Sequence, residues 1–192
     1  MPNWCSNTLE VQGDNKRVKE FAKKAEGKNT KLSLASLYPE PDYEKTEVKP
    51  TFPDVVGNNE PVSIKDSWWD WRIQNWGTKW DVKAEIVAHT NGEIVYSFDS
   101  AWSPPVDWLE KVAQDYPELE FELEYEETGM GFEGVATAID GEVTNETYDV
   151  EYGECKACDN SENIKRMAQL GEDWYCEYCL AEITNIKQIK DD

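Results

Sequence analysis

Apolar and polar positions alternate at the start of the chain, between Asn7 and Val11. Leu9 and Val11 fall on one side of this stretch, and Thr8 and Glu10 fall on the other. Alternation with a period of two is typical of a strand that buries one face. The sequence therefore predicts a short strand near the N-terminus.

The pattern then changes to a helical period. Asp14 follows the turn residue Gly13 and can cap a helix, because its carboxylate accepts hydrogen bonds from the free N–H groups of a first turn. Gly27 is placed to end that helix. The apolar positions that fit one helical face are Val18, Phe21, Ala22 and Ala25.

Residues 28–81 are predicted to form an insertion. Five prolines break any long element in its first part, and only the stretch Leu34–Leu37 is expected to be helical. Five tryptophans then fall within residues 68–80. Trp69, Ile73 and Trp76 have the spacing of one helical face, with Gly77 as the stop.

A second period-two pattern runs from Val82 to His89. Its expected inward positions are Val82, Ala84, Ile86 and Ala88. The dipeptide Asn91-Gly92 favours a tight hairpin turn, because both residues tolerate positive φ. The return strand is predicted over residues 94–99.

Another helix and three further strands follow. Ser103 is the expected cap and Pro104 the first-turn residue of the helix, whose buried side is predicted to carry Leu109, Val112, Ala113 and Tyr116. A strand over residues 119–126 has glutamates on its wet face. Two more strands, near 134–139 and 142–148, flank the turn signal Asp140-Gly141.

This order of elements is β-α-insertion-β-β-α-β followed by a hairpin. It predicts an α+β fold, a ferredoxin-like split βαβ sheet with helices on one face. We expect this domain to occupy residues 1–150, with residues 151–192 as a separate small domain.

Cysteine spacing carries the strongest chemical signal. The pairs Cys155–Cys158 and Cys176–Cys179 each enclose two residues, and 17 residues lie between the pairs. This spacing is typical of a structural zinc site with four thiolate ligands, which leave no position for a catalytic water. The tail is too short to bury a core, so the metal is expected to supply folding free energy.

The remaining candidates for nucleophilic chemistry are isolated. Cys5 needs a base to act as a nucleophile, and the only histidine of the chain is His89. Strand alternation puts the two on different sides, so we expect Cys5 to be a packed core thiol and His89 to be an exposed strand residue. No phosphate loop or paired catalytic carboxylates stand out, and no enzymatic activity is predicted.

The formal net charge is −21 and it is unevenly distributed. Residues 110–151 carry 14 acidic side chains and one basic one, whereas residues 16–31 carry seven basic and two acidic ones. So acidic a chain is not expected to bind nucleic acid directly. The charge can serve solubility alone, or it can form an acidic face for a basic partner; the candidate partner-binding residues are Glu120, Glu122, Glu124 and Glu126.

Three blocks of sequence resemble a known family. They are Met1–Asn7 (MPNWCSN), Trp76–Asp81 (WGTKWD) and Ala101–Pro105 (AWSPP). Together, over roughly residues 1–150, they resemble the Api92-like family, also called YubB-like, of phage and plasmid proteins. The resemblance implies a ferredoxin-like domain and a mobile-element origin, with the zinc-ribbon-like tail as an addition. It implies no activity and no catalytic residue.

The tryptophan-rich block admits two interpretations. Arg72, Trp76, Lys79 and Trp80 can form an aromatic and cationic pocket for a small anionic ligand such as a nucleotide. Alternatively, the tryptophans are core residues and Lys79 extends outward to water.

Three functions therefore remain open. The first is a non-enzymatic phage or plasmid protein that binds a host protein with a basic surface, for example a defence or replication protein, through the edge and wet face of the acidic strand. The second is a binding or sequestering protein for a nucleotide-like ligand. The third is a nucleic-acid-associated regulator that acts through the zinc tail. No stretch is long and apolar enough to span a membrane, and no secretory signal opens the chain, so a cytoplasmic location in the host cell is expected.

Overall fold

The computed structural model describes residues 2–42 and 68–190, with side chains described as far as Ile183. The chain divides into two compact units. The first comprises residues 1–127 and 134–146, and the second comprises residues 128–133 and 147–192. The boundary predicted at residue 150 remains a prediction, and most of the predicted insertion, residues 43–67, lies outside the described residues.

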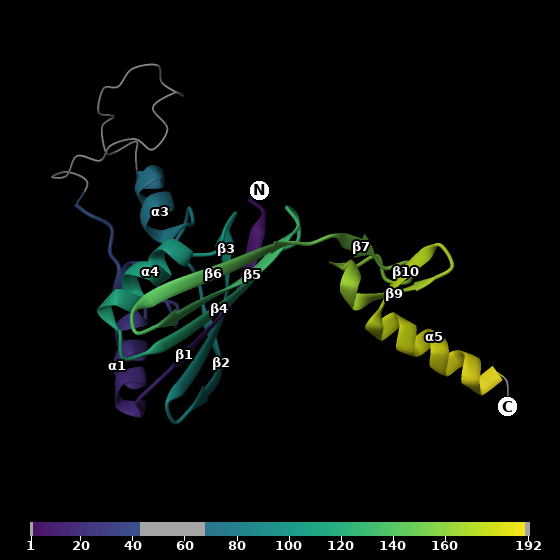
Figure 1. Ribbon diagram of the computed structural model, residues 1–192, viewed down its shortest axis with the longest axis horizontal. Coiled ribbons are helices and arrows are strands. Elements are labelled where there is room, and N and C mark those ends of the chain that lie inside the picture. The colour runs from purple at the N-terminus through teal and green to yellow at the C-terminus, as the bar shows by residue number, and fades with distance from the viewer. Residues whose placement is uncertain (1, 43–67, 191–192) are drawn as a thin grey trace, which may run out of the picture. The chain divides into compact units, whose positions relative to one another are not determined.

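The described elements up to residue 149 follow the predicted order. These are β1 (Trp4–Gln12), α1 (Asn15–Ala25), α2 (Leu34–Leu37), α3 (Trp68–Trp76), β2 (Glu85–Thr90), β3 (Glu93–Ala101), α4 (Val106–Asp115), β4 (Glu120–Glu127), β5 (Phe132–Ile139) and β6 (Glu142–Asp149). The strands form one sheet in the order β2-β3-β1-β4-β5-β6 (Figure 1). β1 runs antiparallel to both of its neighbours, and β2 runs antiparallel to β3. The predicted ferredoxin-like α+β fold is confirmed.

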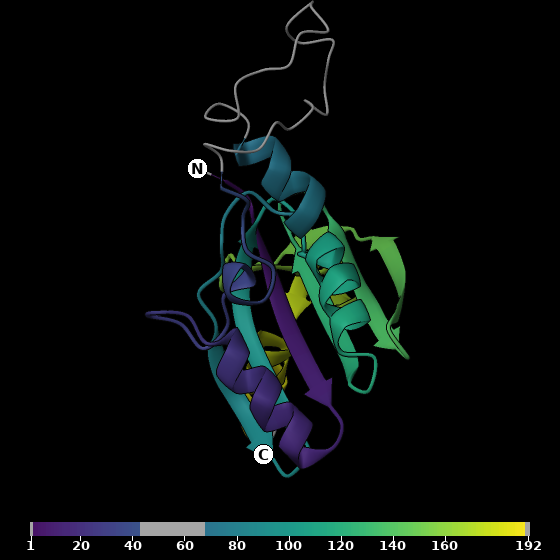
Figure 2. The same cartoon turned by 90° about the vertical axis from the view of Figure 1, so that its left-hand side faces the viewer.

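The core lies between this sheet and two helices on the same face, α1 and α4 (Figure 2). Leu9 of β1 is opposite both Tyr96 of β3 and Leu123 of β4, and all three are buried. Phe21 of α1 meets the ring of Phe121 edge-on, with ring centroids 5.5 Å apart. Alternate residues of the central strands therefore point toward the helices, and the residues between them point the other way.

Local signals at α1 behave as predicted. The Asp14 carboxylate accepts a hydrogen bond from the backbone N–H of Lys16 at 2.9 Å, which caps the helix. Val18, Phe21 and Ala25 are buried, whereas Ala22 is only partly covered. The short helix α2 coincides with the predicted stretch, residues 34–37.

The prediction for β2 is wrong at two of its four inward positions. Val82 and Ala84 are buried but precede the strand, whereas Ile86 and Ala88 are exposed. β2 is the edge strand of the sheet, and its register with β3 shifts between Ile86 and Ala88, which leaves Val87 60% exposed. A bulge of this kind interrupts simple alternation, so the period-two pattern does not extend through it.

The predicted start of α4 is also wrong. The helix begins at Val106, and its cap residue Pro105 offers no side-chain hydrogen bond. The Ser103 hydroxyl instead donates to the carbonyl of Gly77, so it ties two loops together. The predicted buried side, with Leu109, Val112 and Ala113, is confirmed, and Trp108 adds to it.

The predicted face of α3 is shifted. Trp69 is exposed, whereas Trp76 is almost fully buried. The guanidinium of Arg72 lies 5.0 Å from the ring centroids of both Trp68 and Trp76. The packed face therefore includes Trp68, Arg72 and Trp76, which are spaced four residues apart, as neighbours on a helix are.

A buried hydrogen-bond network joins the loop after α3 to the end of β3. The Thr78 hydroxyl donates to the carbonyl of Ala101 and accepts from the Ala101 N–H, each at 3.0 Å. The Asn7 amide donates to the Ser100 hydroxyl at 2.9 Å, and Ser100 donates to the Ser103 carbonyl at 2.7 Å. All three sequence blocks that carry the family resemblance contribute to this network.

The second unit consists of short elements. They are β7 (Tyr152–Glu154), β8 (Ser161–Asn163), a 3-10 turn η3 (Ile164–Arg166), β9 (Met167–Leu170), β10 (Asp173–Cys176) and α5 (Glu177–Lys190). β7 pairs with β8, and β9 pairs with β10, both antiparallel. The buried cluster of this unit contains only one apolar residue besides three cysteines, Met167, with Trp174 and Tyr175 packed against it.

We expect Thr78→Val to lower the free energy of unfolding by about 1–3 kcal/mol, because it leaves two buried backbone groups of Ala101 without their partner. Chemical denaturation measures this change. Thr90→Val, at an exposed position of β2, is the matched control and should change stability by less than about 0.5 kcal/mol. Equal losses in the two variants would contradict a structural role for the Thr78 hydroxyl.

Candidate metal centre and acidic sheet face

The four paired cysteines meet at one point of the second unit. Cys155 and Cys158 lie at the turn between β7 and β8, Cys176 is the last residue of β10, and Cys179 lies in the first turn of α5. All four sulfur atoms lie within 4.8 Å of one another. The sequence-predicted ligand set is therefore brought together as a cluster that can hold a metal ion.

The spacing within the cluster fits metal ligands rather than disulfides. The Cys158 and Cys176 sulfurs are 3.9 Å apart, whereas a disulfide needs about 2.05 Å. Four sulfurs at about 2.3 Å from a tetrahedral ion lie about 3.8 Å from each other. Cys155, Cys176 and Cys179 are buried, so an ion at the centre is largely shielded from water.

A backbone N–H group stabilises the thiolate form of Cys155. The N–H of Cys176 donates to the Cys155 sulfur at 3.4 Å, and such bonds lower the pKa of Cys155 to about 6. The pKa of Cys179 is raised instead, mainly by the neighbouring Cys176 thiol and to a smaller extent by burial. Four crowded sulfurs cannot all ionise without a cation, so a bound metal ion is what permits four thiolates.

Cys5 and His89 lie far apart along the sheet. Cys5 is opposite Ser100 near one end of β3, and His89 is opposite Ile94 near the other. Cys5 is fully buried and His89 is exposed, as predicted. Burial raises the pKa of the Cys5 thiol to about 12, which leaves it protonated and unreactive at neutral pH.

The predicted acidic row lies on β4 and points away from the helices. Glu120, Glu122 and Glu124 are exposed and Glu126 is half-buried, and they alternate with buried Phe121, Leu123, Tyr125 and Glu127. The expected strand edge is wrong, because β4 lies between β1 and β5 inside the sheet. The position of β4 in the sheet depends on pairing with strands distant in sequence, and the local alternation of residues carries no information about that pairing.

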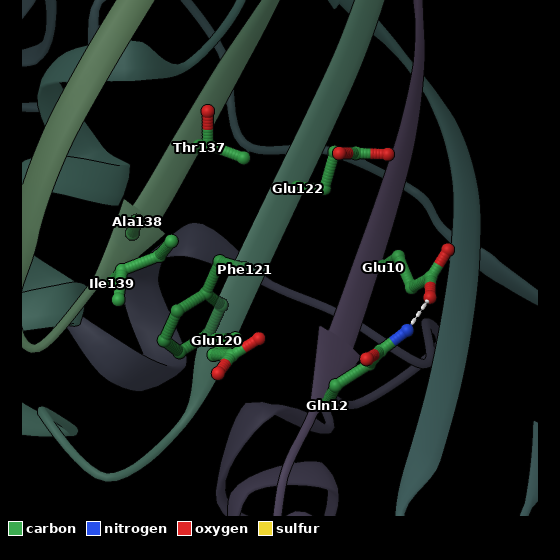
Figure 3. A pocket seen from close by; sticks show the side chains of 8 residues that line it. All are labelled: Glu10, Gln12, Glu120, Phe121, Glu122, Thr137, Ala138 and Ile139. Atoms are coloured by element: carbon green, nitrogen blue, oxygen red, sulfur yellow. Dashed lines mark hydrogen bonds between the residues drawn. The ribbon is translucent and has the colours of Figure 1, made fainter.

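A shallow pocket of about 120 Å³ opens on this face (Figure 3). Glu120 and Glu122 come from β4, Glu10 and Gln12 from β1, and Thr137 and Ile139 from β5. Glu10 is directly opposite Glu122 in the register, and the Gln12 amide donates a hydrogen bond to the Glu10 carboxylate. Like charges face one another here without a cation among the pocket residues.

The sheet and helix α1 carry charges of mainly opposite sign. Within the printed bounds of β1 to β6, the sequence contains 13 acidic residues and no lysine or arginine. Helix α1 alone carries five basic residues, Lys16, Arg17, Lys19, Lys23 and Lys24. We call the surface formed by Glu10, Glu120, Glu122, Glu124 and Glu126 the acidic sheet face.

Among the described residues, the four candidate ligand residues fall into two groups. Arg72 and Trp76 are held inside the α3 region, where Arg72 pairs with Glu40 and the Trp76 indole donates to the Tyr38 carbonyl at 2.9 Å. Lys79 lies 5.0 Å above the Trp80 ring, and Trp80 lines a separate surface pocket with Trp4. The other lining residues, Lys83 and Asp99 among them, were not singled out in the sequence, because only the register of β1 on β3 brings Trp4 close to Asp99.

Comparisons with known proteins agree with this fold. Residues 75–168 match the family model described as the ferredoxin-like domain in Api92-like protein. The chain is also similar to the crystal structure of a protein api92 from Yersinia pseudotuberculosis, with a TM-score of 0.50 and 13% sequence identity over 80% of this chain and 99% of that chain. At this identity the likeness concerns the fold alone. Curated proteins give no significant match.

The predicted family resemblance is thereby confirmed, with a different span. The matched residues begin at Asn75, just before the second sequence block, and continue past Cys155 and Cys158 to Ala168. No helix among the described residues is long and apolar enough to cross a membrane. The mobile-element origin and the contact with a host protein remain predictions.

Thiol accessibility separates the five cysteines. We expect the native, metal-loaded chain to react slowly with a thiol reagent such as DTNB, and removal of the metal by a chelator to release four reactive thiols. Cys5 should react only after global unfolding, because a buried thiol with a pKa of about 12 forms almost no thiolate near pH 8. Fast labelling of Cys5 in the folded chain, identified by peptide mass spectrometry, would contradict its burial.

Proposed function

We propose that this chain, whose residues 75–168 carry the ferredoxin-like domain of Api92-like proteins, is a non-enzymatic binding protein that engages a basic protein surface through its acidic sheet face. The observation that supports this most strongly is the absence of lysine and arginine from all six strands, beside 13 acidic residues. A surface that is acidic only for solubility needs no such segregation, because mixed charges of both signs dissolve a protein equally well.

The spacing of the glutamates on β4 gives a physical reason for such a partner. Alternate residues on a strand are about 7 Å apart, so Glu120, Glu122 and Glu124 hold their carboxylates in mutual repulsion. Glu10 lies directly opposite Glu122 and increases this repulsion. A partner that brings cations relieves the repulsion, so binding should be fast and should weaken as salt is added.

The proposed partner is a protein rather than a nucleic acid or a membrane. Phosphates would meet the same repulsion that the carboxylates exert on one another, whereas lysine and arginine side chains of a protein complement it. In keeping with the family resemblance, we expect this protein to belong to the host of a phage or plasmid, for example to a defence or replication system, and the encounter to occur in the host cytoplasm.

We further propose that the metal of the second unit is zinc and that its role is structural. Four thiolates form a soft tetrahedral set, which zinc occupies without redox chemistry. Among the residues whose side chains are described, the buried cluster includes one apolar residue besides cysteines, Met167, so hydrophobic burial adds little to hold β7 to β10 together. Metal binding then supplies most of the folding free energy of this unit.

Elemental analysis tests the metal assignment. We expect one zinc ion per chain in protein purified without chelator. We expect Cys155→Ser to lose the ion, and the amides of residues 152–176 to lose their protection from hydrogen exchange. Cys5→Ala is the matched control, because it removes a buried cysteine of the first unit and should keep the zinc. Iron in place of zinc would contradict the identity of the metal, and a metal-free chain with a folded tail would contradict its role.

Charge-matched variants test the proposed partner surface. The face variant converts Glu120, Glu122, Glu124 and Glu126 to glutamine. The control variant neutralises four exposed acids elsewhere, namely Glu110, Asp115, Asp140 and Glu172. Both variants have the same net charge, so any difference between them reports position rather than total charge.

We expect affinity capture from the extract of producing cells to retain a discrete basic protein with the wild-type chain and with the control variant. The face variant should retain about tenfold less, and added salt should release the partner. Quantitative mass spectrometry measures the retained protein, and circular dichroism verifies the fold of each variant. Equal retention by the face and control variants would remove the acidic sheet face from consideration.

A further inference from the structure

The three sequence blocks that carry the family resemblance meet at a surface pocket of the first unit. Trp4 comes from the first block, Trp80 and Asp81 come from the second, and Ala101 comes from the third. The pocket measures about 310 Å³ and also includes Lys83, Asp99 and Ser100. This volume lies at the lower end of the range for pockets that bind small molecules.

The floor of the pocket is held from both sides. Ala101 exchanges two hydrogen bonds with the Thr78 hydroxyl, and Ser100 is bonded to Asn7 and to Ser103. The next residue, Trp102, has a φ of 74°, a backbone conformation that a bulky side chain rarely adopts, and its N–H donates to the Asn3 carbonyl at 3.0 Å. A floor fixed in this way is preorganised for a ligand.

Its walls are aromatic and open to solvent. The rings of Trp4 and Trp80 have centroids 5.9 Å apart and an interplanar angle of 44°, so they form a wedge rather than a closed stack. Trp4 is 51% exposed. An indole left this open in a pocket offers a flat stacking surface, which any planar heteroaromatic ring can cover.

Charge at the rim differs from that of the neighbouring sheet. The Asp81 carboxylate is occupied, since it accepts hydrogen bonds from the Ser33 hydroxyl and from the N–H groups of Leu34 and Val82 at 2.6–2.8 Å. Lys83 and Asp99 have no ion-pair partner within the part of the chain that the structure describes, and Lys79 lies over Trp80. With Asp81 counted, two lysines and two carboxylates lie at this rim, so its charges balance, whereas the neighbouring sheet is acidic.

We propose that this pocket binds a mononucleotide, with the base against Trp4, the phosphate near Lys83 and Lys79, and Asp99 as an acceptor for N–H groups on the edge of the base. The combination of an aromatic wedge, cations and one free acceptor matches the three parts of that ligand. The pocket lies on the same side of the sheet as the acidic sheet face, since Ser6 of β1 is opposite both Asp99 of β3 and Glu126 of β4, and it adds a second binding activity to the proposed function. A nucleic-acid strand is not the expected occupant, because its further phosphates would meet the surrounding acidic residues.

Titration of the protein with AMP, GMP, CMP and UMP tests whether the pocket binds a mononucleotide. Binding is measured by calorimetry and by the indole N–H signals in NMR spectra. We expect saturable binding of at least one of the four, with shifts of the Trp4 and Trp80 signals and none at Trp69. The corresponding nucleoside, which lacks the phosphate, should bind about tenfold more weakly. Trp4→Leu should weaken nucleotide binding by about tenfold or more, the magnitude typical of a lost base stack.

Lys83→Gln is a second test variant, because an exposed lysine can be replaced without disturbing the core. It should weaken nucleotide binding but leave nucleoside binding unchanged, whereas Trp69→Leu and Lys16→Gln, both exposed and outside the pocket, are the matched controls. The proposal is overturned if no nucleotide binds up to about 5 mM, a range that covers even weak ligands. It is also overturned if binding survives in both test variants, or if a single-stranded hexanucleotide binds more tightly than its mononucleotide.

Discussion

Among the residues that the structure describes, helices α1 and α4 cover one face of the six-stranded sheet, and most features of the molecule depend on this constraint. Because successive side chains on a strand point to opposite faces, every central strand must be apolar on one side and can be polar on the other. β1 and β4 follow this rule at most positions, with Leu9 and Leu123 in the core and Glu10 and Glu122 on the other face. The acidic sheet face is the wet half of the pattern that builds the core.

The same rule explains how much of the fold could be predicted from the sequence. Local periodicity was sufficient for the order of elements, for the Asp14 cap and for the alternation of β4. Features that depend on distant partners were not predictable: the bulge near Val87, the use of the Ser103 hydroxyl by the Gly77 carbonyl, and the position of β4 inside the sheet. The cysteine cluster was predictable because ligand spacing is local within each pair. The Trp4 pocket was not, because it depends on the register of β1 against β3.

The two units are stabilised in different ways. The first buries large side chains such as Phe21, Trp76 and Trp108, and it supplements them with buried hydrogen bonds that join its loops. Among the described residues of the second, the buried cluster consists of three cysteines and Met167, so sulfur atoms occupy the place of a core. Its folded state is therefore coupled to metal supply and to the protonation of thiols, whereas the first unit responds mainly to packing.

The division of charge between α1 and the sheet also has a consequence for the protein in isolation. Helix α1 carries five basic residues and the six strands carry 13 acidic ones, so charge of opposite sign lies on the two sides of the sheet where α1 covers it. At ionic strengths where the Debye length is about 10 Å or less, neighbouring molecules respond to the nearest charges rather than to the total. Concentrated solutions should then favour head-to-tail contacts, with the helical layer of one copy toward the sheet of the next, and such heterologous contacts extend into chains instead of closing into dimers.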